Sequence, residues 1–207
     1  MAKARARTSH RKQTDRYHHG DLPRAMLQEA VRIIQKDGVE ALTLRGVGER
    51  RGVSRSALYR HFADKQALLL AVAFEGFRLL RTALLEAWTA AGRGREGFDA
   101  MGTAYVRFAL AHPSHYRVMF GGFVTGKAQP EPPPPEFDAF RVLLDAIVEQ
   151  QADGLMRRDD SRQMAHYIWS VVHGIAMLAL DGLIRSPEEA NDLMRFANLR
   201  LRTGIGV

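Results

Sequence analysis

The sequence contains no cysteine, which excludes disulfide bonds and thiolate metal sites and favours a reducing compartment. It has no run of about 18 apolar residues, the length that a membrane-spanning helix needs. The longest apolar region, residues 163–184, is interrupted by histidine, serine, glycine and aspartate. The basic N-terminus also lacks the apolar segment of a signal peptide. These absences favour a cytoplasmic protein without a membrane partner.

Segments that alternate between apolar and polar residues are scarce, and so are β-branched runs, so strands are not expected. Apolar residues recur instead at helical spacing, which predicts an all-α fold. Capping residues and glycine or proline breaks place the expected helices at residues 21–37, 43–50, 55–61, 64–90, 96–111, 114–121, 136–153, 160–184 and 187–201. The proline-dense stretch 127–137 is expected to be a connector.

Positive charge is concentrated near the N-terminus. Residues 1–65 contain 15 Lys and Arg against 7 Asp and Glu, whereas residues 66–207 contain 15 against 16. This segregation favours a polyanion-binding N-terminal unit joined to an electrically neutral remainder. Residues 1–17 hold six of the basic residues, and we expect a disordered arm there. The arm either contacts a minor groove or is a solvated tail that raises non-specific affinity, and we favour the tail.

Residues 43–61 fit two short helices separated by Gly52, which is the arrangement of a helix-turn-helix. Thr43 and Ser54 are the expected N-caps of these two helices, and Asp64 is the expected N-cap of the helix that follows. Four apolar residues are expected to pack the unit together: Val47, Val53, Leu58 and Phe62.

The second short helix carries polar side chains that a core helix would not need. Arg55, Ser56 and Ala57 occupy its first turn, where side chains can reach base edges in a major groove. Arginine suits the O6/N7 edge of guanine, and alanine suits a thymine methyl group. Groups at helix starts, and ring donors such as Tyr59, suit phosphate oxygens. The candidate DNA-binding residues are Thr43, Arg45, Ser54, Arg55, Ser56, Ala57, Tyr59, Arg60, His61 and Lys65.

The stretch TLRGVGERRGVSRSALYRHFADKQALL, with YHHGDLPRAML before it, resembles the DNA-binding domain of the tetracycline-repressor (TetR) family of one-component regulators. The resemblance covers about residues 17–72. The matching positions are Thr43, Val47, Gly52-Val53-Ser54, Leu58-Tyr59, His61-Phe62, Lys65 and Leu68. It implies a ligand-responsive homodimeric repressor that leaves a pseudo-palindromic operator when a small molecule enters the C-terminal domain. The chain departs from the family pattern at Gly48 and Arg51, where the pattern favours alanine.

The chain is therefore expected to have three parts. Residues 1–17 form the disordered basic arm, residues 18–66 the helix-turn-helix DNA-binding domain, and residues 67–207 an effector-binding and dimerisation domain. Within the last part, WSVVHG at 169–174 and AHPSHYRVMFGG at 111–122 are similar to a C-terminal subgroup of the family that has a Trp-x-x-x-His-Gly (WHG) pattern.

The stretch 164–184 is apolar almost all round, so we expect it to be buried on several sides, including against a second chain. Its small residues provide surfaces for close helix contact: Ala165, Gly174, Ala176, Ala179 and Gly182. Residues 191–202 are amphipathic and fit the second helix of a two-fold, four-helix interface. We therefore expect a homodimer formed through the last two helices.

An apolar effector cavity with a few polar groups is expected in the C-terminal domain. The candidate lining residues are Tyr105, Phe108, Met119, Phe120, Phe123, Tyr167, Trp169, His173 and Met177. Aromatic residues and methionines at helical spacing are also typical of an ordinary core, so each candidate has that alternative role. His173 stands out because it lies within an apolar helix, where it either binds ligand or is satisfied by a neighbouring polar group.

Other function classes find less support in the sequence. His112-x-x-His115 and His166 with His173 are histidine spacings worth testing for zinc, but no carboxylate completes either set. No hydrolase, nucleotide-binding or zinc-protease motif occurs, so we expect no enzyme, no metal and no cofactor. Two alternatives to a specific regulator stay open: a helical small-molecule-binding protein and a sequence-independent, nucleoid-type DNA binder.

Overall fold

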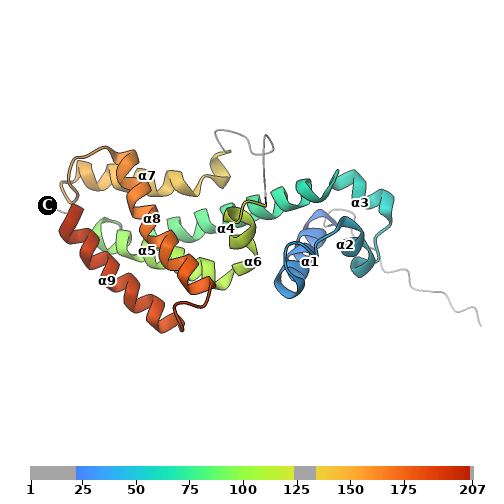
Figure 1. Ribbon diagram of the computed structural model, residues 1–207. Coiled ribbons are helices and arrows are strands. Elements are labelled where there is room, and N and C mark those ends of the chain that lie inside the picture. Colours follow the sequence, from blue (N-terminus) through green and yellow to red (C-terminus); the bar gives the residue numbers. More distant parts are fainter. Residues whose placement is uncertain (1–21, 124–133, 206–207) are drawn as a thin grey trace, which may run out of the picture.

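The computed structural model describes residues 22–123 and 134–205, and all regular structure in these ranges is helical (Figure 1). The elements are α1 (Leu22–Asp37), α2 (Leu44–Arg51), α3 (Arg55–His61), α4 (Lys65–Ala90), α5 (Gly94–Ala111), α6 (Pro113–Phe120), the 3-10 turn η2 (Pro135–Phe137), α7 (Ala139–Ala152), α8 (Ser161–Leu180) and α9 (Pro187–Ile205). The predicted all-α fold is confirmed. The predicted arm, residues 1–17, and residues 127–133 of the connector lie outside the described residues.

The predicted helix starts around the helix-turn-helix are confirmed by their capping hydrogen bonds. The side chains of Thr43, Ser54 and Asp64 each accept a bond from the backbone N–H three residues later. Gly52 ends α2 with φ of 65°, in the left-handed region that glycine enters without steric cost. Local sequence chemistry therefore sets the limits of α2 and α3.

The first three helices pack around buried apolar residues that are continuous with the core of the rest of the molecule. Val47, Leu58 and Phe62 are buried, as predicted, and Val53 packs partly buried against them. Gly48 faces this core, because a Cβ built on it would lie 2.4 Å from Leu58 Cδ1 and 3.3 Å from the carbonyl oxygen of Val53. The glycine at this departure from the family pattern therefore permits a close approach of α2 to α3.

Helix α4 joins this unit to a larger bundle, and Figure 1 shows α1 to α3 at one end of the molecule with α7 to α9 toward the other. Within the bundle, α4 packs on α5, α6 and α7, while α8 packs on α5, α7 and α9. Helix α6 also contacts α1, so the bundle touches the N-terminal unit through a second route besides α4. In the described part of the chain, no helix combines the length and the apolar character that crossing a bilayer requires.

Candidate DNA-binding surface and effector cavity

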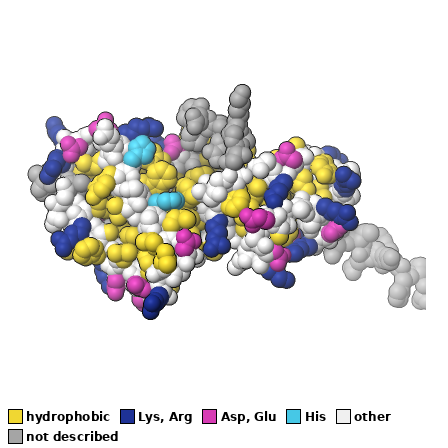
Figure 2. Space-filling view, viewed as in Figure 1, with side chains coloured by type: hydrophobic (Ala, Val, Ile, Leu, Met, Phe, Trp, Pro, Cys, Tyr) yellow, Lys and Arg dark blue, Asp and Glu magenta, His cyan; other side chains and the backbone are white. Residues whose placement is uncertain are grey.

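Most of the candidate DNA-binding side chains lie on the outside of the N-terminal unit. The exposed ones are Thr43, Arg45, Ser54, Arg55, Ser56, Tyr59, Arg60 and His61, whereas Lys65 is half-buried. Tyr59 is 48% exposed although it is aromatic, while Leu58 beside it is buried. The helix thus divides its residues between a buried apolar face and a solvent face of donors and cations, part of which is visible in Figure 2.

Several of these side chains are held in place by neighbours. The Arg55 guanidinium lies over the Tyr59 ring, 5.5 Å from its centroid, so the two side chains share one face of α3. Arg45 pairs with Glu49 at 2.7 Å on the exposed side of α2. Lys65 Nζ donates to the Glu40 carbonyl oxygen at 3.1 Å, so its ammonium is held beside the loop that leads into α2.

Ala57 does not share the exposure of its neighbours. Only 9% of its surface is accessible, because this position of α3 turns toward the core of the unit together with Leu58. Ala57 thus packs mainly within the unit, and its contact with a thymine methyl group stays a prediction that depends on the small surface left exposed. The solvent side of the first turn of α3 therefore consists of Arg55 and Ser56.

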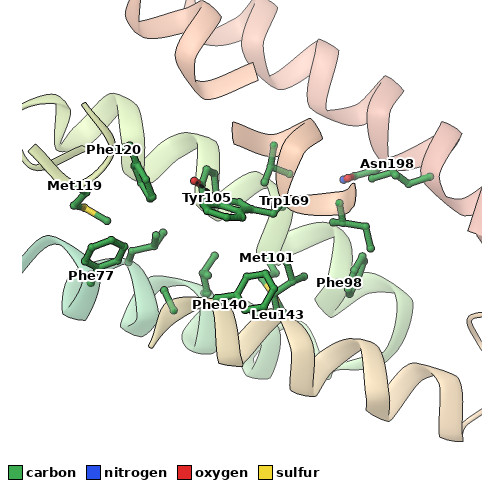
Figure 3. Close-up of a pocket in the computed structure, with 17 residues that line it drawn as sticks. Phe77, Phe98, Met101, Tyr105, Met119, Phe120, Phe140, Leu143, Trp169 and Asn198 are labelled. Carbon is green, nitrogen blue, oxygen red and sulfur yellow. Dashed lines mark hydrogen bonds between the residues drawn. The ribbon is translucent and has the colours of Figure 1, made fainter. Parts of the chain in front are cut away.

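A cavity of about 290 Å³ lies inside the C-terminal bundle (Figure 3). Its walls come from α4 to α9 and are apolar except at a few positions. The lining residues are Phe77, Leu80, Leu84, Phe98, Met101, Gly102, Tyr105, Met119, Phe120, Ala139, Phe140, Leu143, Ile168, Trp169, Val172, Asn198 and Leu201. Among the described residues, no charged side chain lines this space. In Figure 3, Phe140 and Leu143 lie across it from Tyr105 and Trp169, and Asn198 lies at the end away from Phe77 and Met119.

The structure brings together part of the predicted pocket. Tyr105, Met119, Phe120 and Trp169 line the cavity, whereas the other five candidates do not. Tyr167 and Met177 are 55% and 37% exposed on the outer side of α8. The remaining three lie elsewhere. Phe108 lines a shallow groove between α4 and α5, and Phe123 follows α6. His173 does not line the cavity but is hydrogen-bonded to Tyr105, which does.

The cavity also has walls that sequence reasoning missed. Phe77 and Leu84 of α4, Phe140 and Leu143 of α7, and Asn198 of α9 line it. Their helices were predicted, but no pattern in one helix shows which of its apolar residues face a space shared with five others. Asn198 had one detectable feature: it is a polar residue between two buried ones of an amphipathic helix, Ala197 and Leu201.

Four polar groups meet behind one wall of the cavity. The Trp169 indole N–H donates to the Tyr105 hydroxyl at 2.9 Å, and the Tyr105 and Tyr116 hydroxyls lie 3.1 Å apart. His173 Nδ1 is 3.0 Å from the first hydroxyl and 2.7 Å from the second. We call Tyr105, Tyr116, Trp169 and His173 the tyrosine–histidine cluster.

Burial shifts the acidity of this cluster toward its neutral forms. It raises the pKa of Tyr105 to about 12 and raises that of Tyr116 as well. Burial lowers the pKa of His173, because the imidazolium loses hydration without gaining an anionic partner. At neutral pH the cluster therefore holds two phenols and an uncharged imidazole.

The histidines of the two spacings considered for zinc contact other side chains. His115 Nε2 lies 3.1 Å from Glu75 Oε2, which joins α6 to α4. The His112 and His115 rings meet edge to face, 5.8 Å between centroids, and burial lowers the pKa of His112. His166 of α8 lies against the Phe140 ring, 4.9 Å between centroids.

Large apolar side chains are exposed on the outer faces of α8 and α9 and in the turn that joins them. They are Tyr167, Met177, Leu178, Leu183, Phe196 and Leu199, with exposed fractions from 37% to 69%. We call these six residues the α8–α9 apolar face; Figure 2 shows apolar side chains gathered on this side of the molecule. Ala165 and Ala176, expected among the contact residues, are fully buried within the protomer. They are small because α8 packs closely inside its own bundle.

The fold and these sites define a helix-turn-helix protein whose N-terminal unit is followed by a helical bundle with an internal cavity. Residues 26–72 match the model described as "Bacterial regulatory proteins, tetR family", and residues 98–200 match "Tetracyclin repressor-like, C-terminal domain". The chain belongs to the TetR family.

Curated relatives match the N-terminal part of the chain. The class A tetracycline repressor from transposon 1721 of Escherichia coli is 43% identical over 51 residues, which are 25% of this chain and 24% of that protein. The class C tetracycline repressor of E. coli is 45% identical over 49 residues, 24% of this chain and 22% of that protein. The chain thus covers about a quarter of the length of these relatives.

Solved structures match over most of the chain. A protein of unknown function from Rhodococcus sp. RHA1 is 32% identical, with 93% of this chain and all of that chain covered and a TM-score of 0.81. A TetR-family transcription regulator from Marinobacter aquaeolei VT8 shares the fold at 19% identity, with 89% and 95% covered and a TM-score of 0.69. The N-terminal unit and the bundle therefore occur together in known proteins.

Proposed function

We propose that this protein is a sequence-specific DNA-binding regulator, most simply a repressor, that leaves a palindromic operator when a small molecule occupies the bundle cavity. The observation that supports this best is the solvent face of α3. Arg55 and Ser56 point outward in its first turn while Leu58 and Phe62 anchor the helix from below. An exposed helix held this way fits a major groove, and the excess positive charge of residues 1–65 attracts the backbone.

The contacts divide into two kinds. Arg55 and Ser56 are proposed to read base edges. The groups at helix starts and the polar groups farther along α3 are proposed to hold phosphates: Thr43, Arg45, Ser54, Tyr59, Arg60, His61 and Lys65. Phosphate contacts set the register of the helix on the duplex but carry no sequence information.

A palindromic operator requires two copies of α3, which we call the reading helix, and therefore two copies of the chain. The α8–α9 apolar face is proposed to join the two chains. Its six residues form an exposed apolar surface, which a monomer rarely keeps unless it meets a partner. Residues 18–66 would then be the DNA-binding domain, and residues 67–207 the effector-binding and dimerisation domain.

The response to ligand is proposed to be a population shift between dimers with different spacings of the two reading helices. Operator binding needs these helices about 34–36 Å apart, one turn of DNA. Met119 and Phe120 line the cavity and belong to α6, which contacts both α4 and α1. A ligand that repositions α6 would therefore change the placement of the N-terminal unit.

Selection from random-sequence duplexes tests this function and separates the alternatives. A specific regulator enriches one inverted-repeat sequence and binds it with a strong salt dependence. A nucleoid-type protein would bind duplexes without enriching any sequence. A helical ligand-binding protein would show no salt-dependent duplex binding, and either of these results would refute the proposal.

A further inference from the structure

The polar groups around the cavity differ in whether they still have hydrogen-bonding capacity. In the tyrosine–histidine cluster the two tyrosine hydroxyl protons and the Trp169 N–H have acceptors within the cluster. With His173 neutral and Nδ1 unprotonated, one tyrosine hydroxyl donates to Nδ1, the other hydroxyl donates to the first, and the Trp169 N–H donates to Tyr105. The remaining proton of neutral His173 is on Nε2, but His173 does not line the cavity. Tyr105 and Trp169, the two members of the cluster that do line it, use their protons within the cluster, so they offer no free donor to a ligand.

Asn198 is different. Its Nδ2 donates to the Asp99 carbonyl oxygen at 3.3 Å, and no bond to its Oδ1 is found in the described part of the chain. This oxygen lies on the cavity side of α9, 3.4 Å from a Cβ built on Gly102, which itself lines the cavity. The cavity wall therefore has one side-chain acceptor with unused capacity, and it lies at one end of the space.

In the part of the chain that the structure describes, the arginines found at that end already have interactions within the protein. The adjoining small pocket contains Arg95 and Arg202. Arg202 is paired with Asp99 through two of its nitrogens, and Arg95 also has interactions of its own. Burying a carboxylate in the apolar cavity would therefore cost its hydration without the compensation of a free cation.

The remaining walls favour flat, ring-bearing molecules. Phe77, Phe120, Phe140 and Trp169 lie around the space, with Phe120 and Phe140 about 6 Å from the Trp169 ring, centroid to centroid. These rings already contact one another, and the faces and edges that they turn toward the cavity can make further edge-to-face or offset contacts with a ligand ring placed against them. A volume of about 290 Å³ is at the lower end of the range for small-molecule sites, so the ligand is compact.

From this distribution we infer that the effector is an uncharged, ring-bearing apolar molecule with a single hydroxyl donor, bound with its hydroxyl at Asn198 Oδ1 and its rings against the aromatic wall that includes Phe140 and Trp169. This inference rests on the proposed function only in calling the ligand an effector. The geometry of the cavity carries the chemical class by itself.

The experiment uses the full-length protein and three matched probes: 4-hydroxybiphenyl, biphenyl and biphenyl-4-carboxylate. Binding is measured by calorimetry at pH 7.5, where the carboxylate is ionised. We expect 4-hydroxybiphenyl to bind about three- to tenfold more tightly than biphenyl, the gain of one net hydrogen bond. We expect the carboxylate to bind at least about 100-fold more weakly than biphenyl.

Two variants locate the binding. Asn198→Leu is expected to bring the affinity for 4-hydroxybiphenyl to that for biphenyl while leaving biphenyl itself almost unchanged. Asn191→Leu, on the same helix but outside the cavity lining, is the matched control and should keep the difference. Trp169→Phe is expected to abolish the quenching of indole fluorescence by the probes, because Trp88 is not in the wall.

The outcomes separate this inference from the proposed function. If the carboxylate binds as tightly as the phenol, or if Asn198→Leu leaves the difference intact, the ligand class is wrong whatever the protein does with DNA. If no probe binds at all, the inference also fails. A separate assay asks whether 4-hydroxybiphenyl releases the protein from the selected operator. A failure in that assay would contradict the proposed response of DNA binding to ligand, but not the inferred chemical class of the ligand.

Discussion

Arg55 is the residue on which the proposed recognition of the operator sequence most depends. It is exposed, lies in the first turn of α3 and contacts the Tyr59 ring. Replacing it with alanine should reduce discrimination among operator variants by about 1–3 kcal/mol, because one bidentate contact to guanine is lost. Competition binding of wild type and Arg55→Ala on a panel of single-base operator variants measures this. An equal loss on every sequence would assign Arg55 to phosphate.

Lys65 gives the contrasting expectation for a phosphate contact. Lys65→Ala should weaken binding to all duplexes alike and lower the slope of log affinity against log salt by about one. The half-buried Lys65 also bonds the Glu40 carbonyl, so thermal unfolding of the variant is followed in parallel. A weaker affinity with an unchanged salt slope would remove Lys65 from the DNA contact and leave it a structural role.

His173 gives a pH dependence whose sign is fixed by its burial. Its folded-state pKa is below the ordinary value of about 6.5, so the unfolded chain binds more protons as the solution is acidified. The stability that depends on neutral His173 is complete above pH 6.5 and is lost as the pH falls through the lower, folded-state value. His112, also lowered by burial, acts in the same direction.

Urea unfolding at pH 7.5, 6.5, 5.5 and 5.0 measures this effect. The free energy of unfolding of wild type should decrease below pH 6.5, and His173→Gln should show a shallower decrease because one titrating group is removed. A variant whose pH dependence equals that of wild type would show that His173 does not titrate in this range.

At the residue scale, the sequence predicted the groups whose roles are local. The capping residues Thr43, Ser54 and Asp64 accept bonds from N–H groups three positions later, so the local sequence was sufficient to predict these helix starts. The cavity was predicted only in part, because its lining depends on how six helices are rotated against one another. Tyr167 and Met177 have the same chemical character as Trp169 but face solvent.

At the scale of single elements, α2 and α3 are short, and their mutual packing determines whether they hold their shape. Gly48→Ala tests this packing. Alanine gains about 1 kcal/mol of helix propensity, but its methyl group would meet Leu58 at 2.4 Å. Because overpacking a core costs about 1–3 kcal/mol, we expect a net loss of stability and weaker operator binding.

A matched substitution separates the two effects. A Cβ on Gly204, near the end of α9, would meet nothing within 4 Å, so Gly204→Ala should be neutral or slightly stabilising. Thermal unfolding of both variants is the measurement. If Gly48→Ala were as stable as Gly204→Ala, then α2 and α3 would not be closely packed at this point.

Helix α8 shows what periodicity could and could not predict. Its apolar character on almost every side was correctly taken to mean burial on several sides. Ala176, one of the small residues expected to allow close helix contact, is fully buried inside the protomer, and small residues serve close packing there as well as between protomers. The large exposed residues on α8 and α9 become evident only once the inner side of the bundle is known.

At the scale of the whole molecule, two copies of the chain are needed to read an inverted repeat. Leu199→Glu places a charge in the α8–α9 apolar face, where Leu199 is 57% exposed in the protomer. We expect monomers in sedimentation and a loss of operator affinity of more than about tenfold, since the second reading helix no longer binds intramolecularly. Leu85→Glu, at an exposed leucine on α4, is the control and should leave the assembly unchanged. A Leu199→Glu protein that sediments like wild type would place the interface elsewhere.

The central claim is that the solvent face of α3 enters a major groove, and methylation interference on the selected operator tests it most directly. Methylation of guanine N7 blocks the edge that Arg55 is proposed to contact. We predict interference at two symmetrically placed guanines about one DNA turn apart, and its loss at those positions alone with Arg55→Ala. Wild-type binding that tolerates methylation at every guanine N7, or a pattern that Arg55→Ala leaves unchanged, would contradict the account.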